Sequence, residues 1–347
     1  MANILDIRRR IRSVTNTRQI TRAVKMMSAA RLRRAQDRAL AARPYAQMLT
    51  NVLKSLVSRA DIFDQETGDL LHPLLVRREE QNVLLIVVTS DMGKAGAFNA
   101  NILKAAMRFL ESKSGKNIEI ETIGRKGRDF LRRRFAASEP GKSRAAGSAQ
   151  TTLVGEQIGV VGKLQYSLAS EMAERIIDRY EKAEIDSVYI VFNEFKSVIA
   201  QRLVVEQILP VEQIGAQTLA DSKEMEIEEK KRAIEAAKGA GVGLRPADTR
   251  EADARAAAFA TAPVDYIYEQ PPRELFRSLL PKYIGIQIFR ALLESVAAEH
   301  AARMTAMESA TNNATDMIDS LTLQMNRIRQ AKITKEIIEI VSGAAAL

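Results

Sequence analysis

The sequence contains no cysteine, which excludes disulfides, thiol nucleophiles and thiolate metal sites. Its two histidines, His72 and His300, lie far apart in a chain of 347 residues. We therefore predict neither a metal site nor a cofactor. No apolar run is long enough to span a membrane, a task that needs about 20 apolar residues. The arginine-rich start lacks the apolar stretch of a secretory signal peptide and runs unbroken into a helical pattern, so we interpret it as mature protein.

Aromatic residues are scarce. They make up 5% of the chain and include no tryptophan, although 46% of the residues are hydrophobic. Because aromatic side chains anchor compact cores, this composition favours slender packed helices over much of the chain.

Negative charge is missing from one region. The net charge is +9, and residues 1–59 contain 14 Lys and Arg but only Asp6 and Asp37 as acidic residues. A basic segment of this kind indicates an acidic partner or surface.

Both ends of the chain have the pattern of long helices. Residues 3–58 carry apolar residues at alternating steps of three and four, which is typical of a coiled-coil seam. Around residues 18–28 polar side chains occupy this seam, and we interpret the neighbouring Ile20, Val24 and Met27 as a stripe shifted by a stutter. Pro44 is expected to kink the helix locally. At 1.5 Å per residue this helix is about 80 Å long, too long for one domain, so it must project.

The C-terminal region reads as a helix opened by Pro271 and Pro272, and it continues after Pro281 to about Val341. Neither terminal helix can bury its apolar stripe alone. We therefore predict that the two wind around each other as an antiparallel coiled coil.

The middle of the chain alternates strands and helices. This alternation predicts a small doubly wound parallel sheet with an antiparallel edge hairpin. The strands are expected at 82–91, 117–127, 187–197 and 201–211, and the helices at 98–115, 128–135 and 162–185.

Four segments follow from these patterns: an N-terminal helix (1–60), an α/β domain (80–211), a charged and Ala/Gly-rich insertion of low order (212–262) and a C-terminal helix (272–347). The predicted fold class is α/β, a long antiparallel coiled coil of the terminal helices plus a small Rossmann-like α/β domain.

No stretch of the sequence gives a positive sign of catalysis. The segment 89–99 follows a strand, where phosphate-binding loops lie, but it matches neither common glycine-rich motif. We interpret it as a tight turn, and the basic segment 124–135 as a solvated surface. His72, in a polar loop, is expected to be exposed, and His300 to be a surface or packed residue.

The basic N-terminal helix is open to three interpretations. It is a solvated face, a nucleic-acid-binding arm, or a helix that turns against acidic protein surfaces. No aromatic residues alternate with the basic ones and no nucleic-acid-reading motif is present, so the residues alone leave the three alternatives open.

A resemblance separates them. Residues 13–36 and 302–347 resemble the two signature ends of the gamma subunit of F-type ATP synthase. The N-terminal match has Val24 in place of a methionine and Ser28 in place of an alanine. It includes Asn16, Thr17, Ile20, Thr21, Ala23, Met26, Ala29, Arg33 and Gln36, and the C-terminal match includes Arg329, Gln330, Ala331, Ile333, Thr334, Glu336 and the final EIVSGAAAL.

The resemblance implies a non-catalytic rotor shaft that couples proton or sodium flow through a membrane ring to conformational change in a catalytic hexamer. The implied partners are the alpha and beta subunits of the hexamer, an epsilon subunit and the membrane c-ring, with no nucleic acid and no small-molecule substrate. The implied contacts with the catalytic subunits are Lys25, Arg329, Gln330, Thr334 and Glu336. The implied location is the cytoplasmic side of a bacterial inner membrane, as a peripheral protein. A stand-alone nucleotide- or nucleic-acid-binding protein with coiled-coil arms is the alternative.

Two features depart from the family pattern. The loop after the first strand has Met92 and Lys94 where relatives commonly have arginine and leucine. The insertion at 212–262 falls where photosynthetic relatives carry a redox-regulatory segment, and the absence of cysteine excludes thiol control here.

Overall fold

The computed structural model describes residues 4–59, 72–135, 151–160, 162, 164–195, 201–211 and 271–345. The predicted insertion at 212–262 lies outside these ranges. A short 3-10 turn, η1 (Pro73–Leu75), precedes the first strand.

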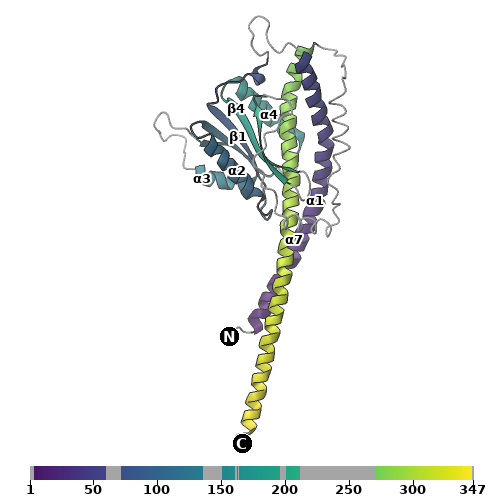
Figure 1. Cartoon of the computed structure of the whole chain (residues 1–347), viewed down its shortest axis with the longest axis vertical. Helices are drawn as coiled ribbons and strands as arrows, with labels where there is room; N and C mark the ends of the chain where they lie inside the picture. Colours follow the sequence, from purple (N-terminus) through teal and green to yellow (C-terminus); the bar gives the residue numbers. More distant parts are fainter. Residues whose placement is uncertain are drawn as a thin grey trace.

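The two terminal helices lie side by side and antiparallel, as predicted (Figure 1). The N-terminal helix α1 (Ile4–Arg59) and the C-terminal helix α7 (Pro272–Ala345) form what we call the shaft. Pro44 lies inside α1 and Pro281 inside α7, and both helices continue through their prolines. The turn that begins at Pro272 and the helix predicted after Pro281 therefore belong to one continuous helix.

The predicted stutter in α1 is wrong. Ile20 and Met27 are 56% and 54% exposed, whereas Thr21, Lys25 and Ser28 are buried. The original seam therefore continues without a shift through polar residues. The sequence interpretation assumed that only apolar side chains fill a seam, but Thr21 and Lys25 find polar partners on α7, as described below.

The α/β domain contains a five-stranded sheet in the order β3-β2-β1-β4-β5, with β1 to β4 parallel and β5 antiparallel at one edge. This topology confirms the predicted parallel sheet and its edge hairpin. The strands are β1 (Asn82–Val88), β2 (Asn117–Ile123), β3 (Thr151–Gln157), β4 (Ser187–Phe195) and β5 (Gln201–Leu209). The helices are α2 (Phe98–Ser112), α3 (Arg125–Phe135) and α4 (Tyr166–Glu181).

Strand β3 was not predicted from the sequence. It is an edge strand with no buried residue, so the segment TTLVGEQ carries no apolar run. Two boundaries also differ from the prediction. Strand β1 ends at Val88, before the turn, and α3 begins at Arg125 because Gly124, with φ +97°, turns the chain directly after β2. A Cβ at Gly124 would lie 2.2 Å from the Thr89 carbonyl oxygen, so the turn requires glycine.

The sheet separates two apolar clusters, and β1 contributes alternate residues to each, as expected for a strand buried on both faces. Leu84 and Ile86 face the cluster that contains α4 and the last turns of α1, whereas Leu85 and Val87 face the cluster that contains α2. Helix α7 contributes to both clusters. Residues 276–292 pack on the first face and residues 297–304 on the second.

Glu80 holds the start of the sheet together and offers a test of this packing. Burial by itself would raise the pKa of the Glu80 carboxyl, but hydrogen bonds from its four donors outweigh burial and hold the pKa at about 2. The donors are Lys113 at 2.5 Å, Lys116, the Ser187 hydroxyl at 2.7 Å and the Tyr189 hydroxyl at 2.9 Å.

We expect Glu80→Gln to lower the free energy of unfolding at pH 7 by about 2 kcal/mol, after allowance for partial solvent screening. A pKa lower in the folded state than in the unfolded state gives stabilisation that is present above about pH 4.5 and is lost as the pH falls towards 2. The difference between wild type and variant should therefore shrink in urea titrations below pH 4.5. Glu111→Gln, on the exposed side of α2, is the control. Equal losses in the two variants would contradict this account.

Candidate functional site

The C-terminal part of α7 extends beyond the first turn of α1, and no helix of the described residues lies beside it (Figure 1). All side chains described from residue 329 to 342 are exposed. We call residues 329–342 the free end. Four of the predicted contact residues lie here, namely Arg329, Gln330, Thr334 and Glu336.

The free end carries both charge and apolar surface. Lys332 lies 3.6 Å from Glu336 and Lys335 lies 3.4 Å from Glu339, and such exposed pairs contribute little to stability. Large apolar side chains, 47% to 71% exposed, lie among these charges: Ile333, Ile337, Ile338, Ile340 and Val341. A contiguous exposed apolar stripe of this kind is typical of a surface that binds another protein.

Lys25, the fifth predicted contact, lies elsewhere. Its ammonium group pairs with Glu308 of α7, and both side chains are largely buried. One turn away, the Thr21 and Thr311 hydroxyls share a hydrogen bond of 2.8 Å. Glu308 precedes Arg329 by 21 residues, or about 30 Å of helix, so Lys25 does not belong to the free end. A contact between Lys25 and a partner stays a prediction.

The positive charge of α1 points away from the seam. The arginines at 8, 9, 10, 12, 22, 33 and 34 are exposed, together with the apolar Ile20, Met26 and Met27. Lys25 is the exception, because its charge is neutralised within the shaft. The shaft therefore presents a basic outer surface with a few apolar side chains.

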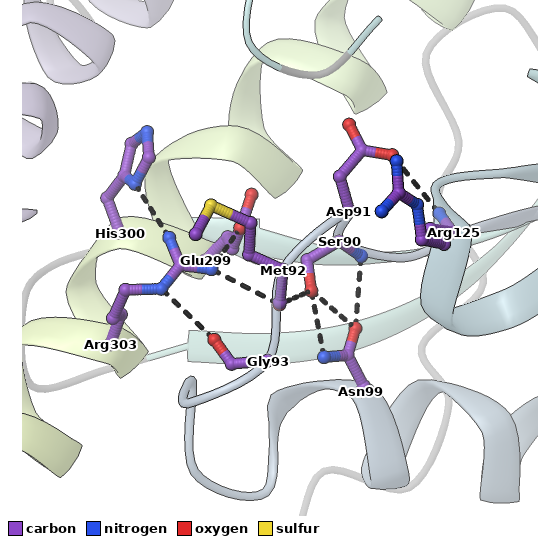
Figure 2. A network of polar contacts seen from close by, with 9 residues as sticks. All are labelled: Ser90, Asp91, Met92, Gly93, Asn99, Arg125, Glu299, His300 and Arg303. Atoms are coloured by element: carbon purple, nitrogen blue, oxygen red, sulfur yellow. Dashed lines mark hydrogen bonds and ion pairs between the residues drawn. The ribbon is translucent and has the colours of Figure 1, made fainter. Parts of the chain in front are cut away.

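The loop after β1 occupies the place where a doubly wound sheet commonly binds a ligand, at the carboxyl ends of its strands. Its polar groups bind one another, as Figure 2 shows. The Ser90 amide and hydroxyl both lie 3.0 Å from Asn99 Oδ1, and Asp91 Oδ1 accepts hydrogen bonds from the amides of Arg125 and Gly159 at 3.1 Å. The loop thus joins the ends of β1, β2 and β3, which agrees with its interpretation as a tight turn.

The same loop contacts the shaft. Arg303 of α7 donates from Nη2 to the Met92 carbonyl and from Nε to the Gly93 carbonyl, both at 3.3 Å (Figure 2). Its Nη2 also pairs with Glu299 at 2.5 Å. The side chain of Met92 is exposed and Lys94 has φ +64°. The two residues that depart from the family pattern therefore form the outer surface of a loop whose backbone is bound to α7. Sequence reasoning missed Arg303, because only the fold brings it next to the loop.

The histidines give no site. His72 is buried, contrary to the prediction. Its Nδ1 accepts the Leu74 amide at 3.2 Å and its ring packs edge-on against Phe276. His300 is half-buried, and burial, reinforced by the nearby Arg303 and Arg31, lowers its pKa to about 4. Over the residues that the structure describes, no group of three His, Asp or Glu side chains is arranged to hold a metal ion.

Helix α3 keeps its arginines exposed at its C-terminal end, at Arg132, Arg133 and Arg134, as expected of a solvated basic surface. Across the described ranges, no helix is long and apolar enough to cross a membrane.

Comparisons with known proteins agree with this geometry. A family model described as ATP synthase matches residues 3–347. The ATP synthase gamma chain of Solibacter usitatus is 46% identical over 346 residues, covering 100% of this chain and 99% of the relative. The gamma chain of Geobacter metallireducens is 41% identical over 349 residues, covering 100% of this chain and 99% of the relative.

Solved structures share the fold. A chain of the Euglena gracilis mitochondrial ATP synthase, from a structure of OSCP, F1 and the c-ring, superposes with a TM-score of 0.54 at 16% identity, covering 99% of this chain and 94% of that chain. A chain of the rotor from the same organism gives a TM-score of 0.52 at 16% identity, covering 95% and 98%.

Proposed function

Since this chain belongs to the ATP synthase gamma-chain family, we propose that it is the non-catalytic rotor shaft of a proton- or sodium-driven F-type complex. The chain is a gamma subunit, part of the central stalk. The finer proposal is that ion flow through the membrane ring turns it, and that its rotation changes the conformation of the catalytic sites in turn.

The free end of α7 is the observation that carries this proposal. A helix that extends past α1, with isoleucines and charges exposed on the same surface, is typical of a surface that binds another protein. A ring of catalytic subunits around the free end would cover this surface. Because α7 is a single asymmetric rod, it would contact three equivalent subunits differently and so favour a different state in each.

The basic outer surface of the shaft fits the same role. Acidic loops on the catalytic subunits would meet the arginines on the outer surface of α1 and form charge-assisted hydrogen bonds with them. A broad apolar face would instead favour a single angle. We propose Arg329, Gln330, Thr334 and Glu336 as contacts with the alpha and beta subunits. Lys25 would contact these subunits only when its ion pair with Glu308 breaks.

We further propose that the α/β domain contacts the epsilon subunit and the membrane c-ring. The protein would then lie on the cytoplasmic side of a bacterial inner membrane as a peripheral subunit. The similarity to gamma chains of bacteria such as Solibacter usitatus supports this location.

The alternative, a stand-alone nucleotide-binding protein, has less support. The groups of the loop after β1 that would hold a phosphate bind one another, and Arg303 occupies two of the loop carbonyls. Catalysis of phosphoryl transfer also requires groups that hold Mg²⁺ and the γ-phosphate. The described part of this loop contains no set of groups arranged to hold them.

Affinity purification of the tagged chain from its native cells tests the proposal. We expect the alpha and beta subunits to co-purify, and we expect the isolated chain to show no ATP turnover. Turnover that persists after complete removal of the catalytic subunits would overturn the rotor assignment, as would a tagged chain that reaches the membrane without the hexamer.

Two residues of the free end give a finer test. Gln330→Ala and Thr334→Ala each remove a hydrogen bond worth about 0.5–1.5 kcal/mol, so we expect ATPase turnover of the assembled complex to fall about 2- to 10-fold. The helical content and the assembly of the complex should not change. Gln324→Ala is the matched control, because Gln324 is exposed on the same helix but lies before the free end, in the part beside α1. Unchanged turnover in the double variant would show that these side chains make no contact that matters for hydrolysis.

A further inference from the structure

Two arginines, one buried and one largely buried, connect α7 to the α/β domain. The first is Arg303, whose guanidinium reaches the backbone carbonyls of Met92 and Gly93 while it pairs with Glu299. The second is Arg290, whose Nη2 lies 2.7 Å from both carboxylate oxygens of Glu206 on β5. We call Arg290 and Arg303 the arginine anchors.

Each anchor ends on a rigid part of the domain. Glu206 lies within the ladder between β4 and β5 and pairs with Ile190. The loop that Arg303 binds is fixed in turn by Asp91, which accepts the amides of Arg125 and Gly159, and by Thr89, whose hydroxyl donates to the Ile123 carbonyl at 3.0 Å and accepts the Gly127 amide at 2.8 Å. The loop is therefore hydrogen-bonded both to the carboxyl ends of the strands and to the shaft.

The anchors hold different sides of α7. They are 13 residues apart, or about 20 Å along the axis, and at 3.6 residues per turn they point about 140° apart around it. The apolar packing changes sides in the same way. Residues 288–292 belong to the core on one face of the sheet and residues 297–304 to the core on the other.

Apolar contacts resist the rotation of a helix only through the shape of the packed side chains, because the hydrophobic effect itself is not directional. Charged hydrogen bonds are directional, and Arg290 makes two to one carboxylate. A helix bound by directional contacts on two sides cannot turn about its axis unless both contacts break.

We propose that Arg290 and Arg303 are positioning residues that prevent α7 from rotating about its own axis within the α/β domain, so that torque passes between domain and shaft through them. This inference rests on the proposed rotor function. The remaining packing holds the domain against the shaft, and the anchors fix its angle.

The test uses two nitroxide labels on the full-length chain, which has no native cysteine. Exposed positions suit both labels: Lys104→Cys on α2 and Gln324→Cys on α7. The anchor variants also neutralise the partner carboxylates, so that no buried charge is left alone: E206Q/R290M, E299Q/R303M, and both together. E119Q/R179M is the matched control, because this pair, 2.6 Å apart, lies inside the α/β domain.

We expect a narrow distance distribution in wild type and in the control, a broader one in each paired variant and the broadest in the combined variant. In the assembled complex in vesicles, the combined variant should keep ATP hydrolysis but lose ATP-driven charging of the membrane, read with a voltage-sensitive dye. A variant that only loosened the fold would lower both activities together. R290K/R303K, which keeps the positive charges, should restore part of the charging.

An unchanged distance distribution in the combined variant would refute the proposal that the arginine anchors fix the angle of α7. A broadened distribution with normal charging per ATP would overturn their role in torque. If the combined variant does not fold, E299Q/R303M alone carries both readouts, with the same expected directions. A wild-type complex that hydrolyses ATP without charging the vesicles would refute the proposed function instead, and the label distances would still report on the anchors.

Discussion

A single disulfide between the shaft and a catalytic subunit is expected to stop ATP hydrolysis by the assembled complex. The chain has no cysteine of its own, so Lys332→Cys introduces one thiol, at a side chain that is 66% exposed on the free end. A second cysteine is placed in the facing loop of a catalytic subunit. A disulfide requires Cα atoms about 4.4–6.8 Å apart, so the bond fixes the shaft at one angle to one of the three catalytic subunits.

The expected size of the effect follows from rotation. Every turnover by a rotary complex requires the shaft to leave the angle at which it is bound, so one bond per complex should reduce steady-state hydrolysis to the level of uncrosslinked molecules. Reductant should restore the rate. The single Lys332→Cys variant, oxidised without its partner cysteine, controls for the substitution. A bond that forms in most complexes while turnover continues would reject rotation and favour a static scaffold.

The second large effect is expected at the ion pair inside the shaft. Lys25→Glu would place a carboxylate beside Glu308, in a layer where both wild-type side chains are largely buried. Loss of one partner of a buried pair costs about 3–5 kcal/mol, and the new like charge adds repulsion. We therefore expect Lys25→Glu and Glu308→Lys, each alone, to lower the free energy of unfolding by at least this much in urea titrations followed by helical circular dichroism.

The double exchange K25E/E308K should recover most of that loss, because it restores an ion pair in the same layer. Lys332→Glu is the matched control, since its pair with Glu336 is exposed and such pairs are worth about 0–1 kcal/mol. Additive losses in the double exchange would mean that Lys25 and Glu308 stabilise the shaft independently, and the ion pair would then not set its register.

This polar layer also explains how the shaft aligns its helices. An apolar seam tolerates slippage by a whole repeat, whereas a single polar layer specifies one register at some cost in stability. The Thr21–Thr311 hydrogen bond and the Lys25–Glu308 pair lie in neighbouring turns, and both form between α1 and α7 in this alignment. Register in turn fixes how far the free end extends past α1, because the length of α7 is constant.

The sequence by itself determined the elements whose signals are local. The apolar periodicity of residues 4–59 and 272–345 predicts two long helices that must cover each other, and the β-branched run of β1 predicts a strand buried on both faces. The family is visible for the same reason, since the matching residues at the two ends of the chain are consecutive.

Only the tertiary structure decided which polar side chains are buried. Lys25 reads as an exposed cation and His72 as a loop residue until Glu308 and Phe276, more than 200 residues away in sequence, are placed beside them. Strand β3 was missed because an edge strand needs no apolar run when β2 supplies its hydrogen bonds. Arg303 has no motif around it, and its carbonyl acceptors at residues 92 and 93 become visible only when the loop after β1 is folded against α7. The physical reason is common to these cases: burial and pairing of a polar group depend on partners distant in the chain, whereas helix and strand patterns depend on neighbours.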